Sequence, residues 1–314
     1  MQYFSVECAR HIVESAAPGH QLVSISRAYG AFTNEVRTLN CRTPAGNAFR
    51  LVVKLLTDDL ADATPRATAD YHGLRIARAH GIPAPEPILL DETGDVLGVP
   101  GMVTRFVEGR QIAGPDDTTA WAEALADQLL RIHDISPDES ERRNIYAGNE
   151  LGLYFLSGDY PAKMAGHPLS ETIYGAVEEL RSGIDELSPV FIHMDYWPGN
   201  VLWLDGQVSA VLDWDAAGYG DPALDVGYFR MNMYLRGIKE AADIFLERYE
   251  SESGAAVRNL GFWELARAAG PLPEPGRWIF ASREMGDASS TVDRADTDYY
   301  EFVHDAIRRA RAGR

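Results

Sequence analysis

The residues of this chain best suited to chemistry are three with side-chain oxygens: Asp195, Asn200 and Asp213. Between the last two lie two apolar runs, 201–204 and 207–212, joined by an Asp-Gly pair that favours a two-residue hairpin turn. Such a hairpin would bring Asn200 and Asp213 to about 7–8 Å from each other, measured between backbones. Magnesium takes one or two protein carboxylate or amide oxygens, and water and substrate phosphates complete its shell. The pattern therefore predicts a nucleotide-bound magnesium at Asn200 and Asp213.

Asp195 lies just before the first predicted strand. There a carboxylate could accept a proton from an attacking hydroxyl while the metal neutralises the phosphate. Asp and Asn also favour turns and helix caps, where they bond backbone donors without doing chemistry, and we interpret Asp205 in that way. We expect His193 to be buried and hydrogen-bonded, holding the loop in place without reacting.

The order of these residues resembles the aminoglycoside phosphotransferase family of kinase-like enzymes. The chain has His-x-Asp, four residues, Asn, a hairpin, Asp-Trp-Asp and then Gly-Asp-Pro-Ala-Leu-Asp. The resemblance implies that Asp195 is the catalytic base and that Asn200 and Asp213 ligate magnesium. It also implies that Asp221 and Asp225 brace the catalytic loop.

Two further positions near this segment bear on the site. Met194 stands where the family commonly has glycine, a change that adds or removes no catalytic group and bears only on loop packing. Asp215, two residues beyond the metal ligand Asp213, is our candidate for contact with the acceptor; the alternative is an ordinary solvated acid.

A kinase-like enzyme also needs a nucleotide-binding half. The run 49–56 is rich in β-branched residues and carries one lysine, Lys54, whose ammonium could pair with nucleotide phosphates. A predicted helix at about 67–79 ends at a Gly and a Pro. The resemblance places Asp70 of this helix where the family usually has Glu, as the partner of Lys54; the alternative is a solvated acid in the first helical turn.

The resemblance places the nucleotide loop at 24–34, which contains Ser26 and one glycine, Gly30. No glycine-rich phosphate motif is present there, so Gly30 either permits close approach to phosphate or only makes a turn. The resemblance further implies that backbone groups from Val103 to Phe106 contact adenine.

These elements predict an α+β, protein-kinase-like fold with two lobes. We expect an N-terminal nucleotide-binding lobe at 1–108, with an antiparallel sheet, one helix and a hinge near 101–108. A larger, mostly helical lobe at 109–314 would bind the acceptor and carry out catalysis. The apolar stripe of 121–133 is typical of a core-facing helix.

Composition limits the partners. The net charge of −18 repels nucleic acid and anionic membranes, so we expect neither as a partner. The two cysteines are too few for a disulfide scaffold, and no long apolar stretch or leader is apparent, which favours a cytoplasmic protein. We expect a monomer or a homodimer.

The predicted activity is transfer of the γ-phosphate of ATP, or of GTP, to a hydroxyl of a small molecule with Mg²⁺ as cofactor. Protein kinases have Asp-Phe-Gly where this chain has Asp213-Trp214-Asp215, and they have a later Ala-Pro-Glu that this sequence lacks. Both differences argue against a protein substrate. An antibiotic such as an aminoglycoside is the favoured acceptor. A metabolite of the homoserine, choline or methylthio-sugar type is the alternative, and a catalytically silent nucleotide-binding scaffold is the alternative from another class.

Overall fold

A computed structural model describes residues 4–27, 34–57, 61–280 and 290–312. By its internal contacts the chain divides into two units. The first comprises residues 1–110, 143–145 and 202–216, and the second comprises residues 111–142, 146–201 and 217–314. The first stretch of the first unit ends at residue 110, and its last stretch includes most of the predicted hairpin.

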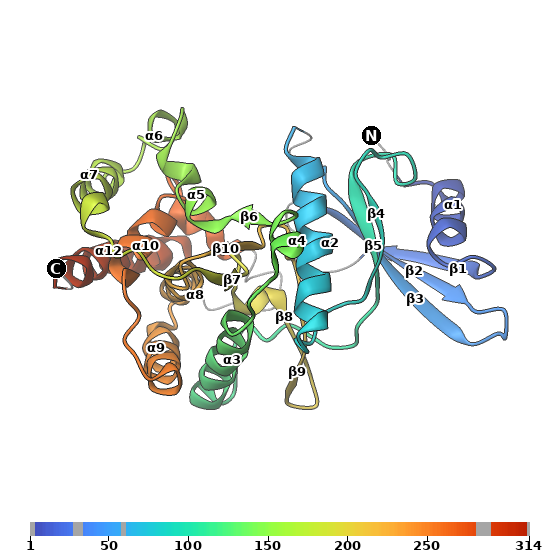
Figure 1. Ribbon diagram of the computed structural model, residues 1–314. Coiled ribbons are helices and arrows are strands. Elements are labelled where there is room, and N and C mark those ends of the chain that lie inside the picture. The colour runs from blue at the N-terminus through green and yellow to red at the C-terminus, as the bar shows by residue number, and fades with distance from the viewer. Residues whose placement is uncertain (1–3, 28–33, 58–60, 281–289, 313–314) are drawn as a thin grey trace. The chain divides into compact units, whose positions relative to one another are not determined.

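The first unit is built on a five-stranded antiparallel sheet with the order β1-β2-β3-β5-β4 (Figure 1). The predicted strand around Lys54 is present as β3, which lies between β2 and β5. Side chains alternate along β3, so Leu51, Val53 and Leu55 are fully buried in one apolar core while Lys54 faces the other side. The strands are β1 (Gln21–Arg27), β2 (Glu35–Arg42), β3 (Ala48–Leu55), β4 (Pro87–Asp91) and β5 (Gly101–Arg105).

Two helices cover this sheet. Helix α1 (Val6–Ala16), which the sequence analysis did not predict, begins at Ser5, whose hydroxyl accepts from the Cys8 amide. Its buried residues Ile12 and Val13 belong to the same core as the apolar face of β3. Helix α2 (Ala63–Ala79) contacts β4 and β5 and lies on the Lys54 side (Figure 1). The sheet therefore has an apolar face under α1 and a charged position under α2.

The connection from β4 to β5 folds around one carboxylate. Asp91 is 5% exposed and accepts from the backbone N–H groups of Gly94, Asp95, Val96 and Leu97, at 2.7–3.1 Å. Burial opposes ionisation of Asp91, but these four donors hold its pKa below the usual value. The loop is thus tied to an ionised carboxylate.

Replacing Asp91 with alanine should lower the free energy of unfolding by about 2–3 kcal/mol at pH 7, because four N–H groups lose a charged acceptor. Since the folded-state pKa is depressed, this stabilisation is complete above the unfolded pKa and disappears as pH falls through the folded value. Urea unfolding at pH 7 and at successively lower pH should show that the difference in the free energy of unfolding between variant and wild type becomes smaller. Asp95→Ala, which removes an exposed carboxylate paired with Thr93, is the control; equal losses in the two variants would contradict the prediction.

The predicted hairpin is confirmed as β8 (Val201–Leu204) and β9 (Gln207–Val211). Its turn residues Asp205 and Gly206 have φ values of 51° and 77°, the positive values that a two-residue hairpin of this kind needs. Trp203 exchanges two backbone hydrogen bonds with Arg110, at 2.8 and 2.9 Å, which explains why the hairpin groups with the first unit.

The second unit is mostly helical (Figure 1). The predicted helix at 121–133 is present as α3 (Thr118–His133), capped by the Asp117 carboxylate. The chain between α3 and β7 forms several short elements and one helix of 11 residues, α7. The remaining elements are α4 (Glu139–Arg142), β6 (Tyr146–Ala147), α5 (Gly148–Gly152), α6 (Tyr160–Lys163), α7 (Ser170–Leu180), β7 (Val190–Ile192), β10 (Gly218–Gly220), α8 (Ala223–Leu235), α9 (Lys239–Ser253), α10 (Leu260–Ala268), α12 (Val292–Ala312) and the 3₁₀ helices Tyr154–Leu156, Arg181–Gly183, Pro198–Asn200 and Pro275–Ile279.

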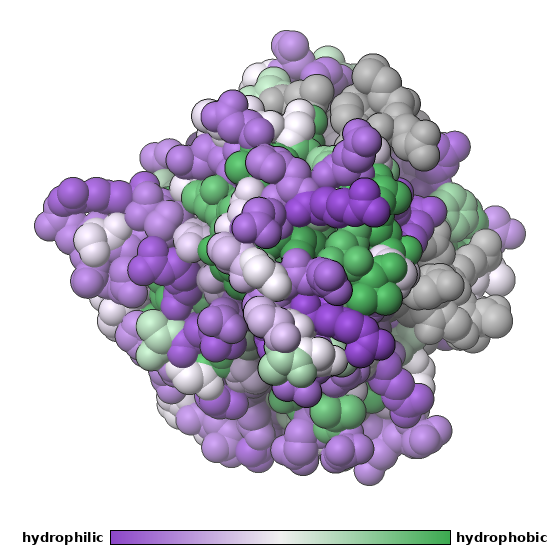
Figure 2. Space-filling view, turned by 90° about the vertical axis from the view of Figure 1, so that its right-hand side faces the viewer, coloured by the Kyte–Doolittle hydropathy of each residue, from purple (hydrophilic) through white to green (hydrophobic). Residues whose placement is uncertain are grey.

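The face in Figure 2 is mostly hydrophilic, and apolar residues gather near its middle among polar side chains. In the first unit, Val6 of α1 and Val23 of β1 are among the exposed large apolar side chains. Within the described residues, every helix is too short or too polar to cross a membrane.

Candidate active site

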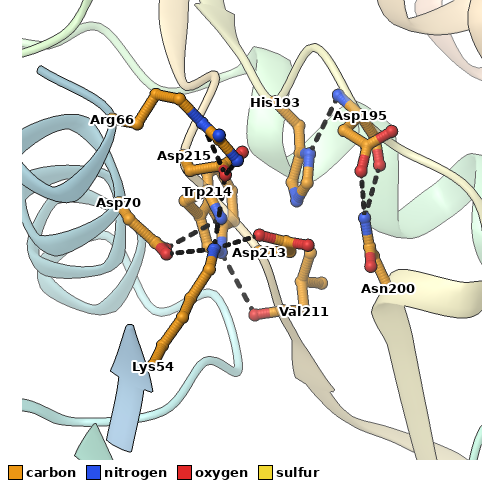
Figure 3. A network of polar contacts seen from close by, with 10 residues as sticks. All are labelled: Lys54, Arg66, Asp70, His193, Asp195, Asn200, Val211, Asp213, Trp214 and Asp215. Carbon is orange, nitrogen blue, oxygen red and sulfur yellow. Dashed lines mark hydrogen bonds and ion pairs between the residues drawn. The ribbon is translucent and has the colours of Figure 1, made fainter. Parts of the chain in front are cut away.

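Lys54 lies at the centre of a buried charged cluster in the first unit (Figure 3). Its Nζ is 2.6 Å from Asp70 Oδ2 and 3.4 Å from Asp215 Oδ2, and it also donates to Asp213 Oδ1. The predicted pairing of Lys54 with Asp70 is therefore confirmed, although Asp is one methylene shorter than Glu. Asp213, with φ of 64°, adopts the left-handed conformation that Asp tolerates, at the point where the chain leaves β9.

Helix α2 is joined to the 213–215 segment at two points one helical turn apart. Asp70 Oδ1 accepts from the Trp214 amide at 3.0 Å, so this carboxylate bonds both Lys54 and the backbone. Four residues earlier, Arg66 donates from Nη2 and Nε to Asp215 Oδ2, at 2.5 and 3.2 Å. The sequence analysis missed Arg66; its spacing from Asp70, which puts both on one helix face, is the signal that was available.

Three carboxylates share two cations in this cluster. Burial disfavours the charged form of Lys54, but Asp213, Asp215 and Asp70 raise its pKa well above the usual value. Burial, together with repulsion from the other two carboxylates, raises the pKa of Asp70 to about 6 despite the attraction of Lys54. For Asp215, burial is outweighed by Lys54 and Arg66, and its pKa is lowered. The cluster thus carries an excess of negative charge that an added cation would relieve.

The predicted acceptor contact, Asp215, is held inside this cluster. Its side chain is only 12% exposed and bonds Arg66 and Lys54. Asp213, by contrast, has a side chain that is 36% exposed. Of the two acids, Asp213 is the more accessible to a solute.

The second unit contains the predicted base, Asp195, in the loop that follows β7 (Figure 3). Asn200 donates from Nδ2 to Asp195 Oδ2 at 2.7 Å and to its backbone carbonyl at 2.9 Å. The amide nitrogen of Asn200 therefore faces Asp195. His193 is fully buried, and its Nδ1 accepts from the Asp195 amide at 3.2 Å. This confirms the expectation that His193 is buried and hydrogen-bonded within the loop.

Asp225, at the start of α8, organises the same loop. Its carboxylate accepts from the amides of His193 and Met194, at 2.8 and 2.6 Å, and from His133 Nε2 at 3.0 Å. Burial opposes its ionisation, but the hydrogen bond and charge of His133 hold the pKa of Asp225 below its usual value. His133, in the last turn of α3, thus bonds a partner 92 residues away along the chain.

The unusual Met194 has a structural consequence. Its φ is 71°, in the left-handed region where glycine is at ease and other residues pay of order 1–3 kcal/mol. Its side chain is nonetheless buried, its amide donates to Asp225, and its carbonyl accepts from Arg267 Nη2 at 2.7 Å. These contacts hold the loop in a conformation that its own sequence disfavours.

Among the described residues, the Asp221 carboxylate bonds groups of α8 and α10 and the residue just before α10. Its carboxylate accepts from the Ala223 amide, from Asn259 Nδ2 and from Trp263 Nε1, at 2.7–2.9 Å. This pattern joins the start of α8 to the start of α10.

The residues predicted to contact the nucleotide lie in different environments. Ser26 lies in β1 opposite Thr38 and is exposed, and Gly30 lies outside the described residues. Val103 is an interior residue of the sheet that is paired with Val53 and Leu89, so its backbone groups face neighbouring strands. Phe106 lies beyond the end of β5, its amide donates to Arg50 O at 3.2 Å, and its ring lies 3.8 Å from the Arg50 guanidinium.

Comparisons with known proteins agree with this fold. The model of the phosphotransferase enzyme family matches residues 33–263. A 4-hydroxytryptamine kinase from Psilocybe cyanescens is 21% identical over 266 residues, which cover 72% of this chain and 70% of that protein. A putative aminoglycoside phosphotransferase from Ralstonia eutropha JMP134 has a similar fold, with a TM-score of 0.66, 17% identity and coverage of 98% of this chain and 99% of that one. A choline kinase from Streptococcus pneumoniae has a TM-score of 0.62 at 16% identity, covering 96% and 98% of the two chains. Structures of an aminoglycoside phosphotransferase with the same fold contain hygromycin B with ADP or with AMP-PNP.

The fold and the family match define a kinase-like phosphotransferase. The chain belongs to the phosphotransferase enzyme family, whose model covers well over half of its length. The predicted kinase-like fold, with an N-terminal antiparallel sheet and a larger helical part, is confirmed.

Proposed function

We propose that this enzyme transfers the γ-phosphoryl group of ATP to a hydroxyl of a small molecule. The observation that carries the proposal is the buried ion pair of Lys54 with Asp70, with Asp213 in contact with the same ammonium. A lysine fixed in this way can pair with nucleotide phosphates, as kinase chemistry requires. GTP would satisfy the same groups, so the nucleotide base is part of the test.

Asp213 and Asn200 are the proposed ligands for Mg²⁺. Asp213 has an accessible carboxylate beside a cluster with excess negative charge. The amide nitrogen of Asn200 bonds Asp195, which leaves its oxygen as the ligand atom. Both oxygen types suit Mg²⁺, which, when bound, would neutralise charge on the transferring phosphate.

Asp195 is the proposed base. Its carboxylate accepts the proton of the acceptor hydroxyl as that oxygen bonds to the γ-phosphorus. The bond from the γ-phosphorus to the β,γ-bridging oxygen breaks, and ADP leaves with the electron pair. Asn200 orients the carboxylate, and Asp225 fixes the loop that carries it.

For the acceptor, we propose a hydroxylated antibiotic such as an aminoglycoside, supported by the net charge of −18 and by the similarity to aminoglycoside phosphotransferases in fold. A hydroxylated metabolite is the second candidate, favoured by a specific observation. Arg267, a cation, contacts the carbonyl of Met194, the residue before the proposed base, and would repel a polycation. The curated kinase relative is named for a hydroxylated aromatic amine.

The test is Mg²⁺-dependent ADP or GDP release with ATP or GTP against aminoglycosides, macrolides, choline, homoserine and hydroxytryptamines, with Asp195→Ala alongside. Turnover on one class that is lost in the variant supports the proposal and identifies the acceptor class. Heat stabilisation by MgATP without turnover on any compound would favour a nucleotide-binding scaffold instead.

A further inference from the structure

The loop that carries the proposed base ends in a short 3₁₀ helix, Pro198–Asn200. The peptide group that joins Gly199 to Asn200 is held at both of its polar atoms. Its N–H donates to the Trp197 carbonyl at 2.9 Å, and its oxygen accepts from Nε2 of Gln111 at 2.5 Å. The last carbonyls of a helix have no partner inside that helix. Gln111, 88 residues earlier in the chain, supplies a partner for the Gly199 carbonyl.

The surroundings hold this peptide group and Gln111 in place. Gly199 packs directly on the indole of Trp197, because a Cβ at Gly199 would lie only 2.2 Å from that ring. Arg236, the buried residue that ends α8, has its guanidinium carbon 5.8 Å from the centre of the Trp197 ring, within cation–π distance. Its Nη2 also donates to the Ala113 carbonyl at 2.8 Å. Arg236 therefore contacts both the indole under Gly199 and the segment that carries Gln111.

We propose that Gln111 is a positioning residue for Asn200, the proposed ligand of Mg²⁺. The side-chain nitrogen of Asn200 donates to the carbonyl and the carboxylate of Asp195 (Figure 3). Gln111 and Trp197 hold the peptide group that precedes the Asn200 Cα. Since the backbone and the amide nitrogen are both held, the direction of the side-chain oxygen is fixed as well. The inference rests on the proposed function, because it takes Asn200 as a metal ligand.

The direction of this oxygen matters for the metal that it would bind. Mg²⁺ requires nearly ideal octahedral geometry at short ligand distances, so a small rotation of one ligand weakens binding. Groups that hold a metal ligand in place typically contribute about tenfold or more to metal affinity. Gln111 would contribute in this way without touching the metal, the nucleotide or the acceptor.

Gln111→Met keeps the length of the side chain, removes the donor and adds no charge. We expect the dissociation constant of Mn²⁺ in the complex of protein with ADP to rise about tenfold, and the affinity for ADP in EDTA to stay within about twofold. Mn²⁺ suits the same oxygen ligands as Mg²⁺, and electron paramagnetic resonance reports its free fraction. Isothermal titration gives the ADP affinity. Gln207→Met is the matched control and should bind Mn²⁺ as wild type does, because Gln207 also donates to a glycine carbonyl, that of Gly206 at 3.2 Å, but in the exposed hairpin turn.

Asn200→Ala separates the two levels of the hypothesis. If Asn200→Ala loses Mn²⁺ affinity while Gln111→Met stays within about twofold of wild type, the positioning role is overturned and the proposed ligand stands. Wild-type Mn²⁺ affinity in Asn200→Ala would overturn the proposed metal ligand and the positioning role with it. A lower melting temperature of Gln111→Met with unchanged Mn²⁺ affinity would show a structural role alone.

Amide hydrogen exchange tests the same contact without metal or nucleotide. The Asn200 N–H should exchange faster in Gln111→Met, since its peptide group loses one of its two hydrogen bonds, and at the wild-type rate in Gln207→Met. Unchanged exchange at Asn200 in Gln111→Met would refute the proposed restraint.

Discussion

Asp195→Ala should lower kcat by about 10²–10⁴-fold and leave the affinity for ATP within about twofold of wild type, because the proposed base acts on the acceptor. Asp195→Asn should behave in the same way while keeping the oxygen that accepts from Asn200, which separates loss of basicity from loss of structure. The measurements are steady-state ADP release and isothermal titration with an ATP analogue.

Asp205→Asn is the matched control for these variants. Asp205 is an exposed turn residue at φ 51°, a conformation that Asn also tolerates, and we assign it no chemistry. Its variant should turn over at the wild-type rate. An Asp195→Ala enzyme with more than about a tenth of wild-type kcat would remove Asp195 from the role of base, since a general base contributes at least about a hundredfold.

Asp225→Ala should destabilise the second unit by about 3–5 kcal/mol. The carboxylate is fully buried, and its loss leaves the His193 and Met194 amides and His133 without their acceptor. Met194, held at positive φ, would be released as well, so turnover should fall together with stability. Urea unfolding followed by circular dichroism, with ADP release on the folded protein, measures both effects.

The control for Asp225 is Asp243→Ala. This substitution also removes an ion pair, that of Asp243 with Arg230, but the Asp243 side chain is 62% exposed. The free energy of unfolding should therefore fall by less than about 1 kcal/mol. The stabilisation from Asp225 depends on an ionised carboxylate with a lowered pKa. It is therefore complete above the unfolded pKa and is lost as pH falls through the folded one. Equal stability of the Asp225 and Asp243 variants at pH 7 would contradict this role.

The arrangement at Asp225 explains how a non-glycine residue is tolerated at Met194. The local sequence disfavours the left-handed conformation there, but three hydrogen bonds from distant elements hold the backbone: two to Asp225 and one from Arg267. The strain is offset by the scaffold around the loop.

Local chemistry accounts for what the sequence alone predicted well. An Asp-Gly pair between apolar runs specifies a two-residue hairpin, and an apolar β-branched run with one lysine specifies a strand with one charged face. The helix ending before Gly81 follows from the same kind of short-range signal. Asp195 and Asn200 are five residues apart in the same loop, so a contact between them could be expected from the sequence.

Other features were decided by the tertiary structure. Arg66 meets Asp215 across 149 positions, and His133 meets Asp225 across 92. Neither pairing has a periodic signature, because a salt bridge or buried hydrogen bond depends on which helix faces pack together. The placement of Val103 between two strands follows from the order β1-β2-β3-β5-β4, which no local pattern encodes. The sequence by itself determined which residues we propose to carry the chemistry, through turn geometry and spacing within short segments. Only the tertiary structure decided which distant side chains orient them, because long-range packing selects those partners.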